Sequence, residues 1–188
     1  LYHSSFSGIQ KARCELKVRT LFNVIGPLVN PIELRCQMIG VSNPTWLKPV
    51  AEALKKLRRR RAAVFHSLDG LDELSTRATS DILFIEGERM SRFRLNPRQF
   101  GFAKAGKGSY EGGGLKTNRE IALRILEDRE HGPRQDVVLL NSGFALWLAG
   151  LSPTVEEGVR RSRWAIRGGR ARSVLDALRR LTRRKASL

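Results

Sequence analysis

The stretch Cys36-Gln37-Met38-Ile39-Gly40-Val41, followed by Pro44 to Lys56 and then by Ala62-Ala63-Val64-Phe65-His66, decides the fold class of this chain. The first and last segments are short apolar runs, which are typical of strands. In the middle segment, apolar side chains recur at intervals of three and four residues, which predicts an amphipathic helix. These side chains are Trp46, Leu47, Val50, Leu54 and Leu57. We therefore expect a strand-helix-strand unit and an α/β fold.

Further along the chain, two more runs predict a β-hairpin. Residues 81–86 and 90–95 flank Gly87-Glu88-Arg89, and the second run alternates apolar and polar side chains, so one face of the hairpin is expected in solvent. The run at 62–66 is apolar almost throughout, as in a parallel strand that is buried on both faces. We therefore expect a mostly parallel sheet with a hairpin, flanked by helices.

The second half of the chain begins with a glycine-rich loop from Phe102 to Leu115 and then predicts helices. These run from a capping box at Thr117-Asn118-Arg119-Glu120 to about Glu130, over Asp136 to Leu148, from a second capping box at Thr154-Val155-Glu156-Glu157, and over Ser173 to Arg184. Gly168-Gly169 is the expected joint between them and the last helix. The prediction is a partial α/β domain at 1–168 and a basic helical tail at 169–188.

The composition limits the classes of protein to be considered. The chain has 188 residues, enough for one domain, and no apolar run reaches the roughly 18 residues that cross a bilayer. Only Cys14 and Cys36 are present, outside any zinc-ligand spacing, so we expect reduced thiols and a cytoplasmic protein. The chain begins at Leu1 without Met and without signal-peptide features, which suggests the later part of something longer.

The positive charge keeps nucleic acid among the candidate partners. Lys and Arg number 35 against 18 Asp and Glu, a net charge of +17, and residues 160–188 hold 11 of the cations against one acid. A second cluster, Lys55 to Arg61, has six cations in seven residues. Such charge attracts polyanions, but without aromatic interleaving or a groove-reading motif it is more typical of a solvated cationic face. Weak, non-specific binding of nucleic acid is the expectation.

The first 31 residues combine polar side chains with glycine and prolines, a combination that a simple hydrophobic core does not require. They include Tyr2-His3, Arg13, and the run Arg19-Thr20-Leu21-Phe22-Asn23 followed by Gly26-Pro27-Leu28 and Asn30-Pro31. Asp69-Gly70-Leu71-Asp72-Glu73 and Asp136 to Gly143 follow in order. In these three segments the chain resembles the anthranilate phosphoribosyltransferase family of tryptophan biosynthesis. The resemblance extends to about residue 168 and implies the C-terminal part of a nucleoside-phosphorylase/phosphoribosyltransferase-like domain.

The resemblance implies transfer of the phosphoribosyl group of phosphoribosyl pyrophosphate (PRPP) to the amine of anthranilate. It places His3, Arg13 and Pro27 at the anthranilate pocket, where the planar fork of Arg13 suits a carboxylate. It assigns Asp72 and Glu73 to Mg²⁺, and adjacent carboxylates in a loop are suitable ligands for this cation. The resemblance implies no protein nucleophile, because departure of pyrophosphate makes the ribose carbon cation-like.

Several features of the family are missing from these 188 residues. The glycine-rich phosphate loop and the K-H-G-N segment are absent, so we expect the isolated chain to be inactive and to need an N-terminal half or a homodimer partner. Two other hypotheses remain: a non-catalytic, nucleic-acid-binding paralogue with a basic surface, and a pyrimidine nucleoside phosphorylase of similar fold. The carboxylates Asp72 and Glu73 favour the enzyme, because they would repel phosphate in the absence of a metal.

Overall fold

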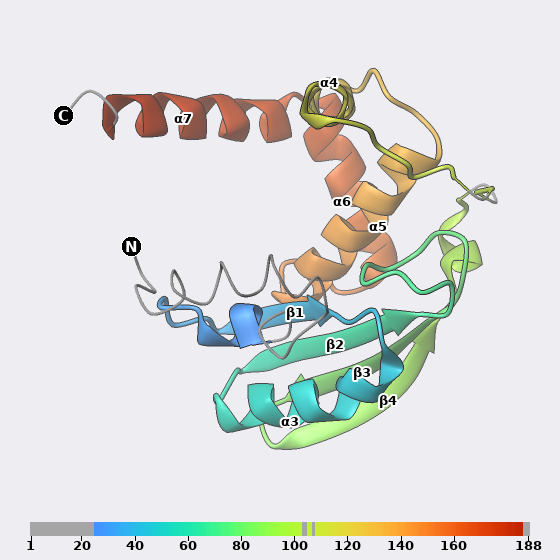
Figure 1. Cartoon of the computed structure of the whole chain (residues 1–188), viewed down its shortest axis with the longest axis vertical. Coiled ribbons are helices and arrows are strands. Elements are labelled where there is room, and N and C mark those ends of the chain that lie inside the picture. The colour runs from blue at the N-terminus through green and yellow to red at the C-terminus, as the bar shows by residue number, and fades with distance from the viewer. Residues whose placement is uncertain (1–24, 103–104, 107, 186–188) are drawn as a thin grey trace, which may run out of the picture.

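The computed structural model of the chain describes residues 25–102, 105–106 and 108–185, which form a sheet covered by helices on both faces (Figure 1). The sheet has four strands in the order β1-β2-β3-β4. Their bounds are Cys36–Gly40 for β1, Arg61–Ser67 for β2, Ser80–Glu86 for β3 and Arg89–Leu95 for β4. The strand-helix-strand unit, the hairpin and the α/β class are thus confirmed.

The sheet is mixed, and the prediction that it is mostly parallel is wrong. Among the described strands, β1 and β2 pair in parallel, whereas β2 pairs with β3 and β3 with β4 in antiparallel register. The run at 62–66 is apolar because helices cover both faces of β2, and this double burial does not depend on the direction of the neighbouring strands. The connection from β2 to β3 is a loop without a crossover helix, which permits the antiparallel pairing.

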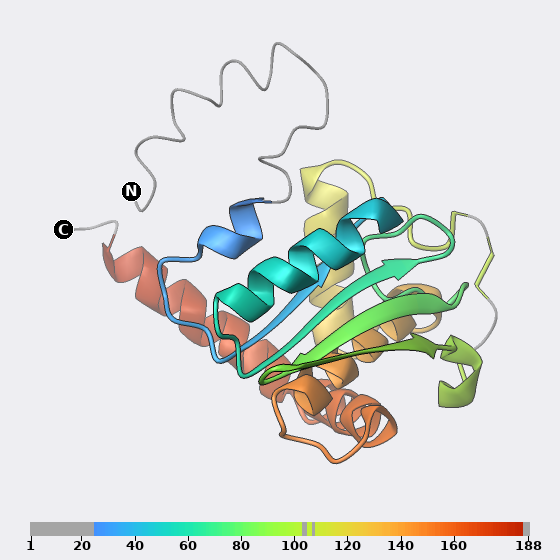
Figure 2. The same cartoon turned by 90° about the horizontal axis from the view of Figure 1, so that it is seen from below.

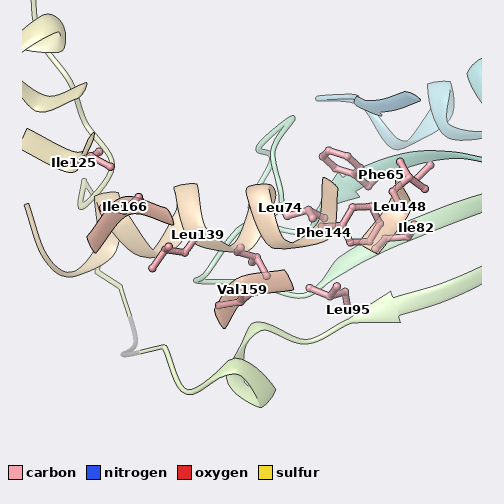
Figure 3. Close-up of a cluster of buried hydrophobic side chains, with 12 residues drawn as sticks. Phe65, Leu74, Ile82, Leu95, Ile125, Leu139, Phe144, Leu148, Val159 and Ile166 are labelled. Atoms are coloured by element: carbon pink, nitrogen blue, oxygen red, sulfur yellow. The ribbon is translucent and has the colours of Figure 1, made fainter. Parts of the chain in front are cut away.

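Helices α3 and α5 cover opposite faces of the sheet (Figure 2). Helix α3, Leu47–Lys56, follows the short 3₁₀ turn η2, Pro44–Trp46, and buries Val50 and Leu54 against Ala62 and Val64 of β2. Successive side chains of a strand point to opposite faces, so the neighbouring Ala63 and Phe65 join the second core cluster. Helix α5, Pro133–Leu148, supplies much of that cluster, including Phe144, which packs edge-on to Phe65 (Figure 3).

Three further helices complete the described chain. They are α4, Leu115–Leu126, α6, Val155–Arg167, and α7, Arg170–Lys185. Helix α6 packs against α5, and α7 contacts α6 and α4. The remaining short elements are the 3₁₀ turns η1, Gly26–Val29, and η3, Pro97–Phe100. None of the described helices is long and apolar enough to cross a membrane.

One of the two expected capping boxes starts its helix. The side chain of Thr154 accepts a hydrogen bond from the Glu157 amide at 3.1 Å and caps α6, as the local sequence predicts. The capping box at Thr117 is wrong, because α4 begins two residues earlier with Gly114 as its N-cap. This helix also ends at Leu126 and not near Glu130, since Asp128 adopts a left-handed backbone conformation.

The expected break at Gly168-Gly169 separates α6 from α7. Gly168 caps the end of α6, and Gly169 has a φ of +68°, a conformation that favours glycine. Helix α7 is tied back to the body by Arg172, which pairs with Glu127 at the end of α4. The division into units at 1–168 and 169–188 stays a prediction.

Helices α5 and α6 cross at two glycines that permit a close approach. A Cβ on Gly158 would lie 2.2 Å from the carbonyl oxygen of Gly143, and a Cβ on Gly143 would lie 2.5 Å from the amide nitrogen of Val159. Both distances are shorter than van der Waals contact and both involve backbone atoms, so a side chain at either position would force the helices apart. This crossing holds α6 against the helix that carries the core.

We predict that Gly158→Ala lowers the free energy of unfolding by about 1–3 kcal/mol, because the added methyl group overpacks the crossing. Gly26→Ala is the matched control, since a Cβ there meets nothing within 4 Å. The control should stay within about 0.5 kcal/mol of the wild-type chain in urea unfolding. Equal stability of the two variants would show that the crossing does not need glycine.

Candidate functional site

Asp72 and Glu73 lie in the loop of residues 68–79, which connects β2 to β3, and both residues are exposed. The loop folds back over the end of β1. A Cβ placed on Gly40, the last residue of β1, would lie 1.6 Å from the carbonyl oxygen of Asp72, so only glycine permits this approach. The carboxylates therefore lie at the carboxyl end of the parallel pair β1 and β2.

The backbone on either side of Glu73 is fixed by hydrogen bonds from distant elements. Asn141 of α5 accepts from the Leu74 amide at 3.1 Å and donates to the Leu74 carbonyl at 2.9 Å. The hydroxyl of Ser67, the last residue of β2, donates to the Glu73 carbonyl at 2.5 Å and accepts from the Ser75 amide at 3.1 Å. The side chain of Leu74 is fully buried in the core. The loop is consequently tied to both β2 and α5.

A second set of contacts braces the later part of the loop. Asp69 accepts hydrogen bonds from Ser75 at 2.8 Å and from the guanidinium of Arg77. The Arg77 guanidinium lies over the ring of Tyr110, 4.9 Å from its centre. The hydroxyl of Tyr110 in turn accepts from the Thr76 amide at 3.1 Å. The glycine-rich segment after β4 thus contributes an aromatic ring that packs against residues 68–79, the carboxylate loop.

The carboxylates of Asp72 and Glu73 differ from the neighbouring acid Asp69, which is paired with Arg77. Within the described residues, neither carboxylate of the pair takes part in a hydrogen bond or an ion pair, in a chain where cations outnumber acids by nearly two to one. Mg²⁺ is commonly held by one or two protein carboxylates together with water and substrate phosphates. The described part of the chain holds no cluster of three or more His, Cys, Asp or Glu side chains suited to a metal. Two adjacent carboxylates are a donor set that Mg²⁺ accepts when other ligands complete its coordination.

A small cavity adjoins the carboxylate loop. Its volume is about 190 Å³, and Glu73 and Tyr110 line it together with Arg134 and apolar side chains of α4 and α5. Arg134 donates to the Glu111 carbonyl at 2.7 Å, which holds the glycine-rich segment against α5. The cavity therefore lies between the loop of residues 68–79, the glycine-rich segment, α4 and α5.

The predicted anthranilate residues are not brought to the carboxylates by the described structure. His3 and Arg13 lie outside the described residues. Pro27 is exposed in η1, and its carbonyl accepts a hydrogen bond at 2.6 Å from Gln37, near the start of β1. Asp72 contacts Gly40 at the other end of this strand, roughly 10 Å away for three residues of strand. The roles of these residues stay predictions.

Comparison with known proteins identifies the family. A sequence profile of the glycosyl transferase family, a/b domain, matches residues 1–172. The chain belongs to this glycosyl transferase family. It is 38% identical over 184 residues to the anthranilate phosphoribosyltransferase of Exiguobacterium sibiricum, covering 98% of this chain and 54% of that protein. The chain thus spans about half the length of the curated relatives that it matches, and its resemblance to the anthranilate phosphoribosyltransferases is confirmed.

Solved structures agree with the family assignment. The anthranilate phosphoribosyltransferase of Thermus thermophilus superimposes with a TM-score of 0.83 at 34% identity, over 93% of this chain and 51% of that one. The Saccharomyces cerevisiae enzyme, solved in complex with PRPP and Mg, matches with a TM-score of 0.83 at 23% identity over 93% of this chain and 50% of that one, which supports the fold alone. The phosphoribosyltransferase-type fold is thereby confirmed.

Sequence reasoning missed the residues that hold the carboxylate loop of this glycosyl transferase domain. Asn141 belongs to a segment whose resemblance to the family is visible in the sequence, but nothing local indicates that its amide reaches Leu74, 67 residues away. Nothing in the sequence marks Ser67 as a hydrogen-bond donor to the Glu73 carbonyl. The support from Tyr110 follows from no motif, since it depends on the path of the glycine-rich segment.

The basic cluster from Lys55 to Arg61 is used largely for internal contacts. Arg59 is buried and donates to Gln37 and to the Leu34 carbonyl. Arg61 lies over the rings of Phe84 and Trp147. Lys55 pairs with Glu88. These contacts remove three of the six cations from any continuous surface that could face a polyanion.

We predict that Gly40→Ala displaces the carboxylate loop, because the new methyl group overlaps the Asp72 carbonyl. The free energy of unfolding should fall by about 1–3 kcal/mol. Amide hydrogen exchange should become faster at Leu74 and Ser75, while the paired amides of β2 and β3 serve as an internal control and keep their relative protection. Unchanged exchange at Leu74 would mean that the loop does not depend on the absence of a side chain at residue 40.

Proposed function

We propose that this chain supplies the metal-binding side of an anthranilate phosphoribosyltransferase of tryptophan biosynthesis. The observation that carries the proposal is the pair of exposed carboxylates, Asp72 and Glu73, which have no partner among the described residues and lie on a loop fixed from both sides. The curated relatives reported above are named as that enzyme, and the yeast protein was solved with PRPP and Mg. Transfer of a phosphoribosyl group to anthranilate is the activity that these features support best.

The proposed reaction joins the amine nitrogen of anthranilate to the first carbon of the ribose and breaks the bond from that carbon to pyrophosphate. The amine loses a proton, and the leaving group departs as pyrophosphate. No residue of the protein needs to form a covalent bond, so positioning and charge stabilisation account for catalysis. Magnesium, when bound, would offset the charge that develops on the pyrophosphate oxygens. Asp72 and Glu73 would hold that ion at the end of β1.

The anthranilate side of the site is assigned to His3, Arg13 and Pro27. A guanidinium can grip the anthranilate carboxylate with two parallel hydrogen bonds, and a histidine can add a third. Pro27 would close against the aromatic ring. These assignments rest on the family resemblance of residues 1–31, and in the full site the separation between Pro27 and the carboxylates would be spanned by PRPP together with anthranilate.

We further propose that the partner of this chain is a polypeptide equivalent to the part of its relatives that it does not span. Helix α7 extends away from α4 and α6 (Figure 1) and leaves Val174, Leu178 and Leu181 exposed by 69%, 56% and 63% along one stripe. Edge strand β4 is protected by arginines, whereas edge strand β1 carries none within its bounds. An apolar stripe and a strand edge without charged side chains within Cys36–Gly40 are suited to a polypeptide neighbour. A homodimer and a cytoplasmic location stay predictions.

No observation favours the nucleic-acid alternative. Several cations of the last two helices are paired within the chain, such as Arg160 and Arg161 with Glu157 and Arg172 with Asp176. The relatives reported above are transferases. Any binding of nucleic acid would then be a weak consequence of the net charge.

The transferase proposal predicts that the isolated 188-residue chain forms no phosphoribosyl anthranilate, because the phosphate-binding segments of the family are absent from it. A chimera should form the product in the presence of magnesium. In this chimera, the chain replaces the matching C-terminal part of the Exiguobacterium enzyme. The measurement is the decrease in anthranilate fluorescence on addition of PRPP.

The control is the same chimera with Asp72→Asn and Glu73→Gln, which should lower turnover at least tenfold and raise the magnesium requirement. Circular dichroism and binding of anthranilate establish that each chimera is folded. A folded chimera that binds both substrates without forming product would contradict the proposal. So would activity of the isolated chain at a level typical of enzymes.

A further inference from the structure

We propose that Asn141 is a positioning residue for the magnesium carboxylates. This inference rests on the proposed function, because it concerns the same Asp72 and Glu73. Asn141 lies on α5, between the fully buried Leu140 and the residues that pack against α6, so its own position is fixed by the core. It touches neither carboxylate, and its effect would act through the backbone of Leu74.

The carboxamide of Asn141 makes the hydrogen bonds that hold the backbone of Leu74. Its oxygen accepts from the Leu74 amide at 3.1 Å, and its nitrogen donates to the Leu74 carbonyl at 2.9 Å and to the Val137 carbonyl at 2.9 Å. Both amide hydrogens and the oxygen are thus engaged. An aspartate could not donate to the two carbonyls, and an apolar side chain could satisfy none of the three groups.

The hydrogen bonds between Asn141 and Leu74 lie close to the two carboxylates along the chain. Leu74 is the residue directly after Glu73, so their Cα atoms are about 3.8 Å apart. The Glu73 carbonyl is held by Ser67, and the Asp72 carbonyl lies against Gly40. With three consecutive residues fixed in their backbone, the two carboxylates leave the loop from defined points. A preorganised pair of ligands loses less conformational entropy on binding a cation.

If Asn141 had a purely structural role, loss of an equivalent pair of hydrogen bonds elsewhere would weaken Mn²⁺ binding equally. Asn118 provides this matched control. Asn118 makes the same two-sided contact with Gly113, accepting from its amide at 2.8 Å and donating to its carbonyl at 2.8 Å. Gly113 lies in the glycine-rich segment and is remote in sequence from Asp72 and Glu73. Asn118 lines the same small cavity as Glu73, but its side chain is hydrogen-bonded to Gly113 and not to the backbone of residues 72–75. Asn118→Ala therefore removes an equivalent pair of hydrogen bonds without releasing the carboxylate loop.

The experiment measures Mn²⁺ binding to the full chain by electron paramagnetic resonance of the free ion, with the metal alone as the probe, because PRPP binds divalent cations itself. Asn141→Ala should weaken Mn²⁺ binding about tenfold, within the range seen when groups that orient metal ligands are removed. Asn118→Ala should leave the dissociation constant within about twofold. Ser67→Ala removes the hydrogen bond to the Glu73 carbonyl and should also weaken binding, so it decides the question if Asn141→Ala does not fold.

The double variant Asp72→Asn, Glu73→Gln separates this inference from the proposed function. If this variant binds Mn²⁺ as the wild-type chain does, or if the wild-type chain binds none, the proposed metal site is wrong and the positioning role fails with it. If the double variant loses binding while Asn141→Ala and Ser67→Ala keep it, the metal site stands and the positioning role is overturned. Equal losses in Asn141→Ala and Asn118→Ala would also overturn it, because they would reflect a general loss of stability.

Discussion

Burial of β2 on both of its faces constrains the rest of the described structure. Ala62 and Val64 pack against α3, while Ala63 and Phe65 pack toward α5. The chain leaves β2 at Ser67 and passes between Gly40 at the end of β1 and Asn141 of α5. The carboxylate loop is formed in that space, and its position follows from the packing of the two helices.

Residues outside the loop hold its backbone and leave two acidic side chains without partners among the described residues. Ser67, Asn141 and Gly40 act on backbone atoms of residues 72–75, by hydrogen bonds or by the absence of a side chain. Each such hydrogen bond contributes about 1 kcal/mol to stability, but an unsatisfied buried group would cost more. The arrangement is thus stable without using the carboxylates of Asp72 and Glu73, which remain available to a cation.

Local features of the fold could be predicted from the sequence, and features that depend on distant contacts could not. The Thr154 cap and the hairpin at Gly87 are set by neighbouring residues, so their patterns were sufficient. The helix expected from Thr117 begins instead at Leu115, where Gly112 to Gly114 and the contact of Asn118 with Gly113 set its start. The apolar run at 62–66 indicates that this strand is buried, but it does not indicate whether the neighbouring strands are parallel or antiparallel to it. Asp72 and Glu73 were found through family resemblance, whereas the contact of Asn141 with Leu74 joins segments that no local pattern connects.

The central claim is that the end of β1 and the loop after β2 form the metal-binding surface of this chain. Paramagnetic broadening of backbone amide signals by Mn²⁺ locates the ion most directly. The account predicts that broadening is strongest at Gly70 to Leu74 and at Gly40 and Val41. Broadening centred on another set of acids, such as Glu111 and Glu120, or spread evenly over the chain, would contradict it.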